Sequence, residues 1–232
     1  AELAANRRAQ SLRGPHISLG ADGQVVARGG AGNERFQLAR DGNDVRVRIS
    51  DRDSGKILAN ERFDASKVKG VTVDAGDGDD VIENGFRSLR GVDGAVIQPG
   101  AGTNLVYNNG VGAHIQGSQA KPQGAVGDVV LNEGARTRID GSSGADHIVS
   151  NARGSRITAT GAGDLTVATG ADQEIDAGRT GRVVSNGQNN LRAVRDNVLS
   201  SPGAAIDLET GAQLEANRLR GILERTRLRA GE

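Results

Sequence analysis

The stretch Val71-Thr-Val-Asp-Ala-Gly-Asp-Gly-Asp-Asp-Val-Ile82 contains two short apolar segments separated by a turn rich in glycine and aspartate. Its residues Val73 and Ile82 each begin a series that recurs along the chain. One row consists of Val73, Ile97, Ile115, Ile139, Ile157 and Ile175, and the other of Ile82, Val106, Val130, Ile148, Thr166 and Val184. Successive members lie 18 or 24 residues apart, as if six residues had been inserted at intervals into a repeat of 18. Such a period is typical of stacked repeat proteins.

Two polar columns accompany these rows. One stands just before the second apolar row and consists of Asp80, Asn104, Asp128, Asp146, Asp164 and Arg182; the other stands just after it and consists of Asn84, Asn108, Asn132, Asn151 and Asn186. Glycine precedes each member of the first column by one or two positions. Because glycine permits positive φ, and Asp and Asn bond nearby amides, both columns indicate turns. Each repeat is therefore predicted to run turn, strand, turn, strand.

We predict an all-β fold, a parallel right-handed β-solenoid (β-helix or β-roll) with about six coils of about 18 residues each. Parallel strands roughly 4.8 Å apart place equivalent side chains above one another. The two apolar rows then form the interior, where each buried side chain contributes roughly 1.5–3 kcal/mol. Aromatic residues make up only 2% of the chain, which favours a thin interior of this kind. Since no coil buries its apolar face alone, neighbouring coils supply the stability.

Four segments follow from this interpretation. They are an N-terminal arm (1–30), a β-meander cap (31–66), the solenoid (67–190), and irregular coils with a C-terminal amphipathic helix (191–232). Alternating apolar residues on both sides of Asp41-Gly42 predict the antiparallel meander. We expect this meander to cover the open edge of the first coil. The insertions at 84–96 and 116–127 are expected to be exposed loops.

The composition argues against several functional classes. The 29 basic and 29 acidic residues balance, so no overall basic character points to nucleic acid. No apolar run approaches 18 residues, so no membrane span is expected, and the absence of cysteine rules out Cys-based metal sites. The histidines, His16, His114 and His147, lie in no zinc-protease pattern, and there is no nucleophile elbow or phosphate loop. We therefore predict a protein that is not an enzyme.

The segment Ala75-Gly-Asp-Gly-Asp-Asp-Val-Ile82 resembles the nonapeptide of RTX, or haemolysin-type, calcium-binding repeats, and weaker versions occur at 99–106 and 142–148. The resemblance implies a parallel β-roll with calcium between stacked turns. In that family backbone carbonyls and a sixth-position Asp hold the ion, and this position falls here on Asp80, Asn104 and Asp146. The chain departs from the family because glycine-aspartate turns occupy one edge only and the leading double glycines are lost.

The acidic column has two interpretations. Stacked carboxylates repel one another by a few kcal/mol per pair at an effective dielectric near 20, and calcium would relieve that repulsion. The predicted calcium ligands are, in the first turn, Asp74, Asp77, Asp79 and Asp80, and in a second place Asp140 and Asp146. Alternatively, each Asp accepts hydrogen bonds from turn N–H groups and needs no ion. The sequence leaves both interpretations open.

These observations lead to a functional expectation. The chain is expected to be a secreted or translocated bacterial module, extracellular or in a host cell, that acts as a structural or protein-interaction platform, with calcium as a stabilising ion. A protein partner is expected, but neither its identity nor the oligomeric state follows from the sequence. One alternative is a toxin or type III effector that docks a host protein. Another is a carbohydrate-active β-helix, whose groove residues would be Arg87, Arg90, Asp93, Glu133, Arg136 and Asp140.

Overall fold

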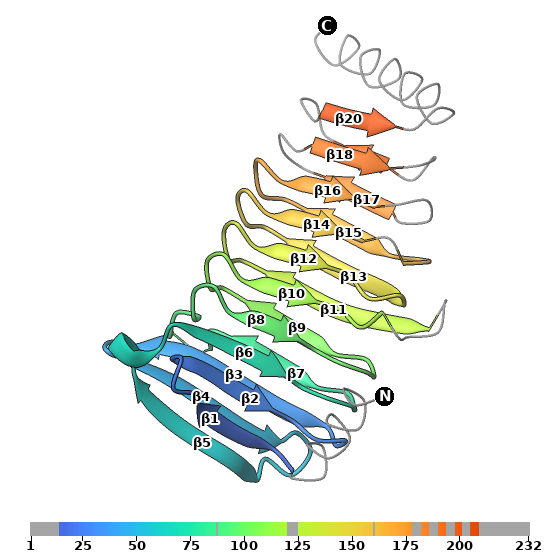
Figure 1. Cartoon of the computed structure of the whole chain (residues 1–232). Helices are drawn as coiled ribbons and strands as arrows, with labels where there is room; N and C mark the ends of the chain where they lie inside the picture. The colour runs from blue at the N-terminus through green and yellow to red at the C-terminus, as the bar shows by residue number, and fades with distance from the viewer. Residues whose placement is uncertain are drawn as a thin grey trace, which may run out of the picture.

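The computed structural model describes residues 14–86, 88–119, 125–159, 161–177, 182–185, 190–193, 198–200 and 205–208. These residues form an all-β fold of two ten-stranded sheets, here called sheet A and sheet B (Figure 1). One 3-10 helix, η1 (Ala65–Lys67), accompanies the strands, and this part of the chain contains no α-helix. The C-terminal helix predicted within 191–232 lies outside the described residues.

Both sheets are mixed, with mostly parallel neighbours. Sheet A contains, in spatial order, β1 (His16–Leu19), β2 (Gln24–Arg28), β6 (Gly70–Asp74), β8 (Val96–Gln98), β10 (His114–Gln116), β12 (Arg138–Asp140), β14 (Arg156–Thr158), β16 (Glu174–Asp176), β18 (Asn190–Ala193) and β20 (Ala205–Leu208). Sheet B contains β19 (Val198–Ser200), β17 (Arg182–Ser185), β15 (Leu165–Ala168), β13 (Ala145–Ser150), β11 (Val126–Asn132), β9 (Leu105–Asn108), β7 (Val81–Asn84), β3 (Glu34–Asp41), β4 (Asp44–Asp51) and β5 (Ile57–Asp64).

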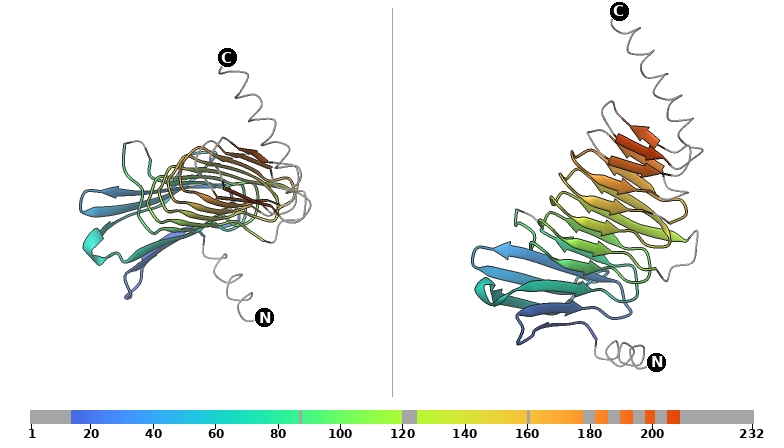
Figure 2. Two further views of the ribbon diagram at one scale, coloured as in Figure 1. Left: turned by 90° about the horizontal axis from the view of Figure 1, so that it is seen from above. Right: turned by 45° about the horizontal axis from the view of Figure 1, so that its top comes forward.

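From β6 onward, consecutive strands alternate between the two sheets, so each pair of strands adds one rung to each sheet. Viewed from above, the rungs overlie one another, and the tilted view shows them rising in chain order (Figure 2). The core lies between the sheets and is built mainly from aliphatic side chains. Strand pairing between distant segments, rather than local structure, therefore holds the molecule together.

The strand register confirms the first predicted apolar row. Val73 pairs with Ile97, and the pairing continues rung by rung through Ile115, Ile139, Ile157 and Ile175. Each of these side chains is at most 1% exposed. Because the β-branched residues alternate with outward residues on three-residue strands, each rung contributes one aliphatic side chain to the core.

The second predicted row needs one correction at its end. Thr166 pairs with Val183 rather than with Val184, so the step from β15 to β17 is 17 residues (166 to 183). Val183 is 1% exposed and lies in the core, whereas Val184 faces outward. Arg182 pairs with Leu165 and also faces outward, so it does not continue the aspartate column. The connection between these strands is one residue shorter than the sequence period suggested.

The asparagine column departs from the prediction at its fourth member, and its fifth predicted member, Asn186, lies outside the described residues. Asn84, Asn108 and Asn132 pair in register, but the next partner of Asn132 is Ser150 rather than Asn151. Asn151 is exposed in the following turn. The small side chain of Ser150 occupies the buried position. The sequence pattern instead assigned that position to the adjacent Asn151.

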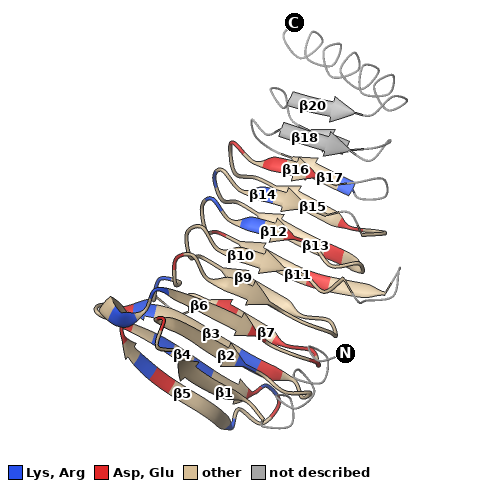
Figure 3. Ribbon diagram, in the orientation of Figure 1, with Lys and Arg blue, Asp and Glu red and all other residues tan. Residues whose placement is uncertain are grey.

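The N-terminal segments join the same two sheets. β3, β4 and β5 form the predicted antiparallel meander, and β3 pairs in parallel with β7 and so covers that edge of sheet B. The predicted N-terminal arm contains β1 and β2, and β2 pairs in parallel with β6 and covers the corresponding edge of sheet A. β5 forms the outer edge of sheet B, where charged residues and a β-bulge in its pairing with β4 are typical of a protected edge (Figure 3).

The first insertion is exposed only in part: Ser88, Arg90, Asp93 and Gly94 are exposed, as expected, but other residues of it pack against the core. Val92 is 7% exposed and belongs to the core cluster. The backbone N–H of Arg40 donates to the carbonyl of Arg90 at 2.8 Å, which ties this insertion to the end of β3. In the second insertion, residues 120–124 lie outside the described residues.

Candidate functional site

The outer surface of sheet B from β7 to β17 is unusually apolar. Each strand there points two or three side chains away from the core, and the register stacks most of them into two adjacent rows, in which Glu83, His147 and Arg182 are the polar members. We call this surface the sheet B face; its apolar residues are Val81, Leu105, Tyr107, Val129, Leu131, Val149, Leu165, Val167 and Val184. Leu105, Leu131 and Val149 are 38%, 39% and 38% exposed. Contiguous apolar patches of this kind mark interaction sites in soluble proteins.

The outer surface of sheet A provides an internal comparison. Its outward residues on the equivalent rungs are almost all polar or charged; they are Thr72, Asp74, Val96, Gln98, His114, Gln116, Arg138, Asp140, Arg156, Thr158, Glu174 and Asp176. Both surfaces belong to strands of similar length in the same stack. Solvation alone would favour the polar pattern on both, so the apolar composition of the sheet B face calls for a separate cause.

Sequence reasoning did not identify the sheet B face, although a signal for it was present. In Leu105-Val-Tyr107, Val129-Val-Leu131 and Leu165-Thr-Val167 the residues on both sides of the inward residue are apolar. In the strands of sheet A, such as Arg138-Ile-Asp140, those flanking positions are polar. A run that is apolar at inward and outward positions alike indicates a strand whose two faces are both covered.

The aspartate column is buried and forms a hydrogen-bonded ladder. The backbone N–H of each member donates to the side-chain oxygen of the next member, one rung away: Glu34 to Asp80 at 2.7 Å, Asp80 to Asn104 at 2.8 Å, Asn104 to Asp128 at 3.0 Å, Asp128 to Asp146 at 2.6 Å, and Asp146 to Asp164 at 2.8 Å. These side chains are between 0% and 5% exposed. The side chains of the column therefore accept N–H bonds, as the second interpretation expects, mainly across rungs and, for Asp146, also within its own turn.

Asp80 has the most perturbed environment in this ladder. Burial raises the pKa of Asp80 to about 8, and the carboxyl groups of Glu34 and Asp79 add to that rise. Its Oδ1 accepts the Glu34 N–H, while its Oδ2 is buried and has no hydrogen-bond partner among the described residues. Burial likewise raises the pKa of Asp164 to about 6. These shifts favour the protonated form of Asp80 in the folded chain at neutral pH.

The opposite edge holds an asparagine ladder. The Nδ2 of Asn84 donates to the Oδ1 of Asn108 at 2.7 Å, and the Nδ2 of Asn108 donates to the Oδ1 of Asn132 at 2.8 Å. The ladder continues to the Oγ of Ser150 at 3.2 Å. Each of the three amides also accepts a turn N–H or donates to a turn carbonyl, so it fixes both its own turn and the next rung.

The first set of predicted calcium ligands does not converge on one point. Asp74 is the last residue of β6 and lies on the outer surface of sheet A, where its Oδ2 is 3.8 Å from the Nε of Arg28. Asp77 and Asp79 are exposed in the following turn, where Asp79 accepts the N–H of Thr103 at 2.7 Å. Asp80 points into the interior. The turn therefore distributes its four carboxyl groups over three environments.

The second predicted pair is also separated. Asp146 is buried and accepts hydrogen bonds from the N–H and the hydroxyl of Ser142. Asp140 faces outward, where it contacts Nε2 of His114 at 2.7 Å and Nε of Arg138 at 2.9 Å. Burial acts to raise the pKa of Asp140, but the bonds from His114 and Arg138 outweigh it and the pKa is lowered. His114 is thus part of a polar cluster on the outer surface of sheet A.

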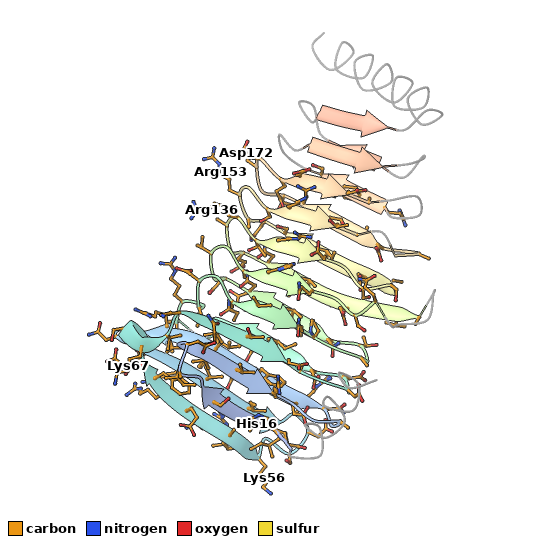
Figure 4. All side chains as sticks on the ribbon, in the orientation of Figure 1. His16, Lys56, Lys67, Arg136, Arg153 and Asp172 are labelled. Atoms are coloured by element: carbon orange, nitrogen blue, oxygen red, sulfur yellow. The ribbon has the colours of Figure 1, made fainter. Side chains whose placement is uncertain are left out.

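One column of turn residues adopts positive φ, in the left-handed region of the Ramachandran plot. Gly94, Gly112 and Gly154 adopt φ of 65°, 68° and 68°, and the same position is filled by Arg136 with φ 55° and by Asp172 with φ 56°. Figure 4 shows Arg136, Arg153 and Asp172 projecting from neighbouring turns at this edge. Arg153 pairs with Asp172 at 2.7 Å. A non-glycine residue in this conformation is strained by about 1–2 kcal/mol.

Within the described ranges, no group of three or more His, Asp or Glu side chains is arranged to hold a metal ion. Calcium binding remains a prediction. No helix in the same part of the chain is long and apolar enough to cross a membrane. Comparison with protein-family models, curated proteins and solved structures gives no match. In the geometry of this chain, the sheet B face is the feature that bears most directly on function.

Proposed function

We propose that this chain is a non-enzymatic β-solenoid module that acts as a protein-interaction platform, with the sheet B face as its binding surface. The alternation of strands between two sheets and the 18-residue register between parallel rungs support a solenoid of about 18 residues per coil. The secreted or host-directed location and calcium stabilisation suggested by the RTX resemblance belong to this proposal as well.

The observation that carries the proposal is the difference between the two outer surfaces. An exposed leucine costs solvation free energy at roughly 25 cal/mol per Å² of apolar surface. The sheet B face repeats that cost on every rung from β7 to β17, whereas sheet A avoids it with polar residues. A surface that buries these rows against a partner recovers this free energy, and a flat β surface offers many equivalent contacts.

A capture experiment with matched variants tests this function. The full chain, a Val149→Lys variant of the sheet B face and a Thr158→Lys variant of the sheet A surface would be immobilised and exposed to the same protein mixtures. Bound proteins would be quantified by mass spectrometry. We expect the wild-type chain and Thr158→Lys to retain a common set of proteins that Val149→Lys loses. Equal capture by all three chains would show that the sheet B face is not the binding surface.

A further inference from the structure

Four arginines lie together at one edge of sheet A, where β12 and β14 follow their turns. Arg136 and Arg138 belong to one rung and Arg153 and Arg156 to the next, and we call these four the arginine cluster. We propose that the arginine cluster is a second interaction surface, on the other sheet from the sheet B face, and that it binds carboxylates of an acidic peptide segment in a partner protein. This surface goes beyond the proposed function, which rests on the sheet B face.

The strand register and the turns bring the four side chains together. Arg138 of β12 is the register partner of Arg156 of β14. In the turns before these strands, the backbone N–H of Arg136 donates to the carbonyl of Arg153 at 2.9 Å, and both side chains project from the edge (Figure 4). The Cγ of Arg136 lies against Gly154, 3.7 Å from the place where a Cβ on that glycine would be. Each arginine therefore has another arginine as its neighbour on the adjacent rung.

This arrangement has costs that the fold itself does not require. Like charges on directly opposite strand positions destabilise a sheet, and Arg138 and Arg156 occupy such positions. Arg136 adopts φ 55°, although Gly112 and Gly154 fill the same position in the turns on either side of it. Strained residues of this kind cluster at ligand-binding sites. A bound anion would offset these costs, because it neutralises the adjacent like charges and contacts the side chain that the strained backbone presents.

The ion pairs within the chain leave the ends of the guanidinium groups accessible. Arg138 and Arg153 reach Asp140 and Asp172 through Nε, at 2.9 and 2.7 Å, and their side chains are 60% and 79% exposed. Among the described residues, no hydrogen bond or ion pair engages the terminal nitrogens of these two arginines or any side-chain nitrogen of Arg136. The ends of planar guanidinium groups are suited to bidentate pairing with carboxylates.

The acidic residues beside the arginine cluster favour a short acidic peptide over a polyphosphate chain. Asp140, Asp172 and Glu174 pair with three of the arginines, so four positive and three negative charges leave a local net charge of +1. Binding of nucleic acid depends on a basic stripe that neutralises many successive phosphates. The three carboxylates would repel such a row of charges, whereas one or two Asp or Glu side chains of a peptide need only the exposed guanidinium ends.

An NMR titration of the nitrogen-labelled full chain with a peptide of alternating Glu and Ser tests the proposal, at about 20 mM salt where screening is weak. Exposed ion pairs are individually weak, so we expect Kd roughly in the range from 100 µM to 1 mM, with amide shifts centred on the arginine cluster. Arg136→Gly and Arg153→Gln should each raise Kd about threefold to fivefold. Arg62→Gln is the matched control, because Arg62 is an exposed, ion-paired arginine on β5, and its Kd should equal that of the wild-type chain.

Three results would overturn the proposal. They are an absence of peptide binding by the wild-type chain, a Kd that is the same in Arg136→Gly, Arg153→Gln and Arg62→Gln, and tighter binding of an oligothymidylate of equal charge than of the peptide. Glycine is compatible with φ 55°, so Arg136→Gly is expected to keep the fold, and Arg153→Gln changes only an exposed side chain. None of these measurements involves the sheet B face, so this proposal and the proposed function can fail independently.

Discussion

Replacing Asp80 by asparagine perturbs the most unusual carboxyl group in the molecule while keeping its shape. Asp80 is fully buried, and burial raises its pKa from 3.8 to about 8. In the unfolded chain the pKa returns to its ordinary value, so at pH 7 unfolding releases a proton that the folded state holds. Stability from this group is therefore greatest in acid and is lost as the pH rises from about 4 to 8.

The magnitude follows from the same pKa values. At pH 7, which is about three units above the unfolded pKa of 3.8 and still below the folded pKa, each unit corresponds to about 1.4 kcal/mol, so this linkage costs about 4 kcal/mol compared with a side chain that does not titrate. Asparagine keeps the acceptor for the Glu34 N–H. Its added amide also needs an acceptor; at the next rung the Nδ2 of Asn104 donates to Asp128 at 3.0 Å, which shows that the column tolerates an amide. Allowing for incomplete satisfaction, we expect Asp80→Asn to stabilise the fold by about 2–4 kcal/mol at pH 7.

Denaturant unfolding in the presence of a chelator, at pH 4.5 and pH 7.5, measures this effect. The gain should be smaller at pH 4.5 and larger at pH 7.5, because the cost of ionising this group on unfolding grows by about 1.4 kcal/mol per pH unit between the unfolded pKa of 3.8 and the folded pKa of about 8. Asp77→Asn is the control, since Asp77 is exposed in the same turn and should change stability by less than about 0.5 kcal/mol. A destabilised Asp80→Asn chain at pH 7.5, or a gain that does not depend on pH, would refute the reasoning.

Three further predictions follow. Asn108→Ala should destabilise the fold by about 2–4 kcal/mol, because it removes the bonds of this buried amide to Asn84, to Asn132 and to its own turn at Gly110, whereas Asn151→Ala at an exposed turn should be nearly neutral in chemical denaturation. Arg136→Gly should stabilise by about 0.5–1 kcal/mol in the same assay, because glycine adopts φ 55° without strain, and a loss of stability would contradict this. If calcium stabilises the chain, adding it should raise Tm and a chelator should lower it, as followed by circular dichroism; an unchanged Tm would remove calcium from the proposal.

The long-range register could be predicted from the sequence because the inward positions are nearly uniform. Ile115, Ile139 and Ile157 can occupy equivalent positions only if 18- and 24-residue segments close onto one another. The error at Val184 arose where two valines stand side by side, so the pattern alone could not show which one faces inward. Strand propensity and the repeat period do not show that a turn is one residue shorter. The pairing of Thr166 with Val183 shows which valine faces inward.

The candidate site was much less accessible to sequence reasoning. The acidic residues from Asp74 to Asp80 are close in the sequence and therefore suggested one cluster. Strand alternation and the turn instead place Asp74 on the outer surface of sheet A and Asp80 in the interior. The sheet B face was missed for the opposite reason: its residues are far apart in the sequence and become neighbours only through the register. The pairing of His114 with Asp140, 26 residues later, depends on the same long-range contact.

The stacking of residues 18 positions apart is best tested by cross-linking on the sheet A surface. The chain has no cysteine, so a pair introduced at Thr158 and Asp176, which are strand partners, can be treated with dibromobimane, a short reagent that fluoresces when it joins two thiols. Cysteines at Asp140 and Asp176 form the control, because two rungs, or roughly 10 Å, separate them. We predict rapid intramolecular cross-linking in dilute solution for the first pair and little for the second. Equal rates for both pairs, or none for the first, would contradict the stacked register.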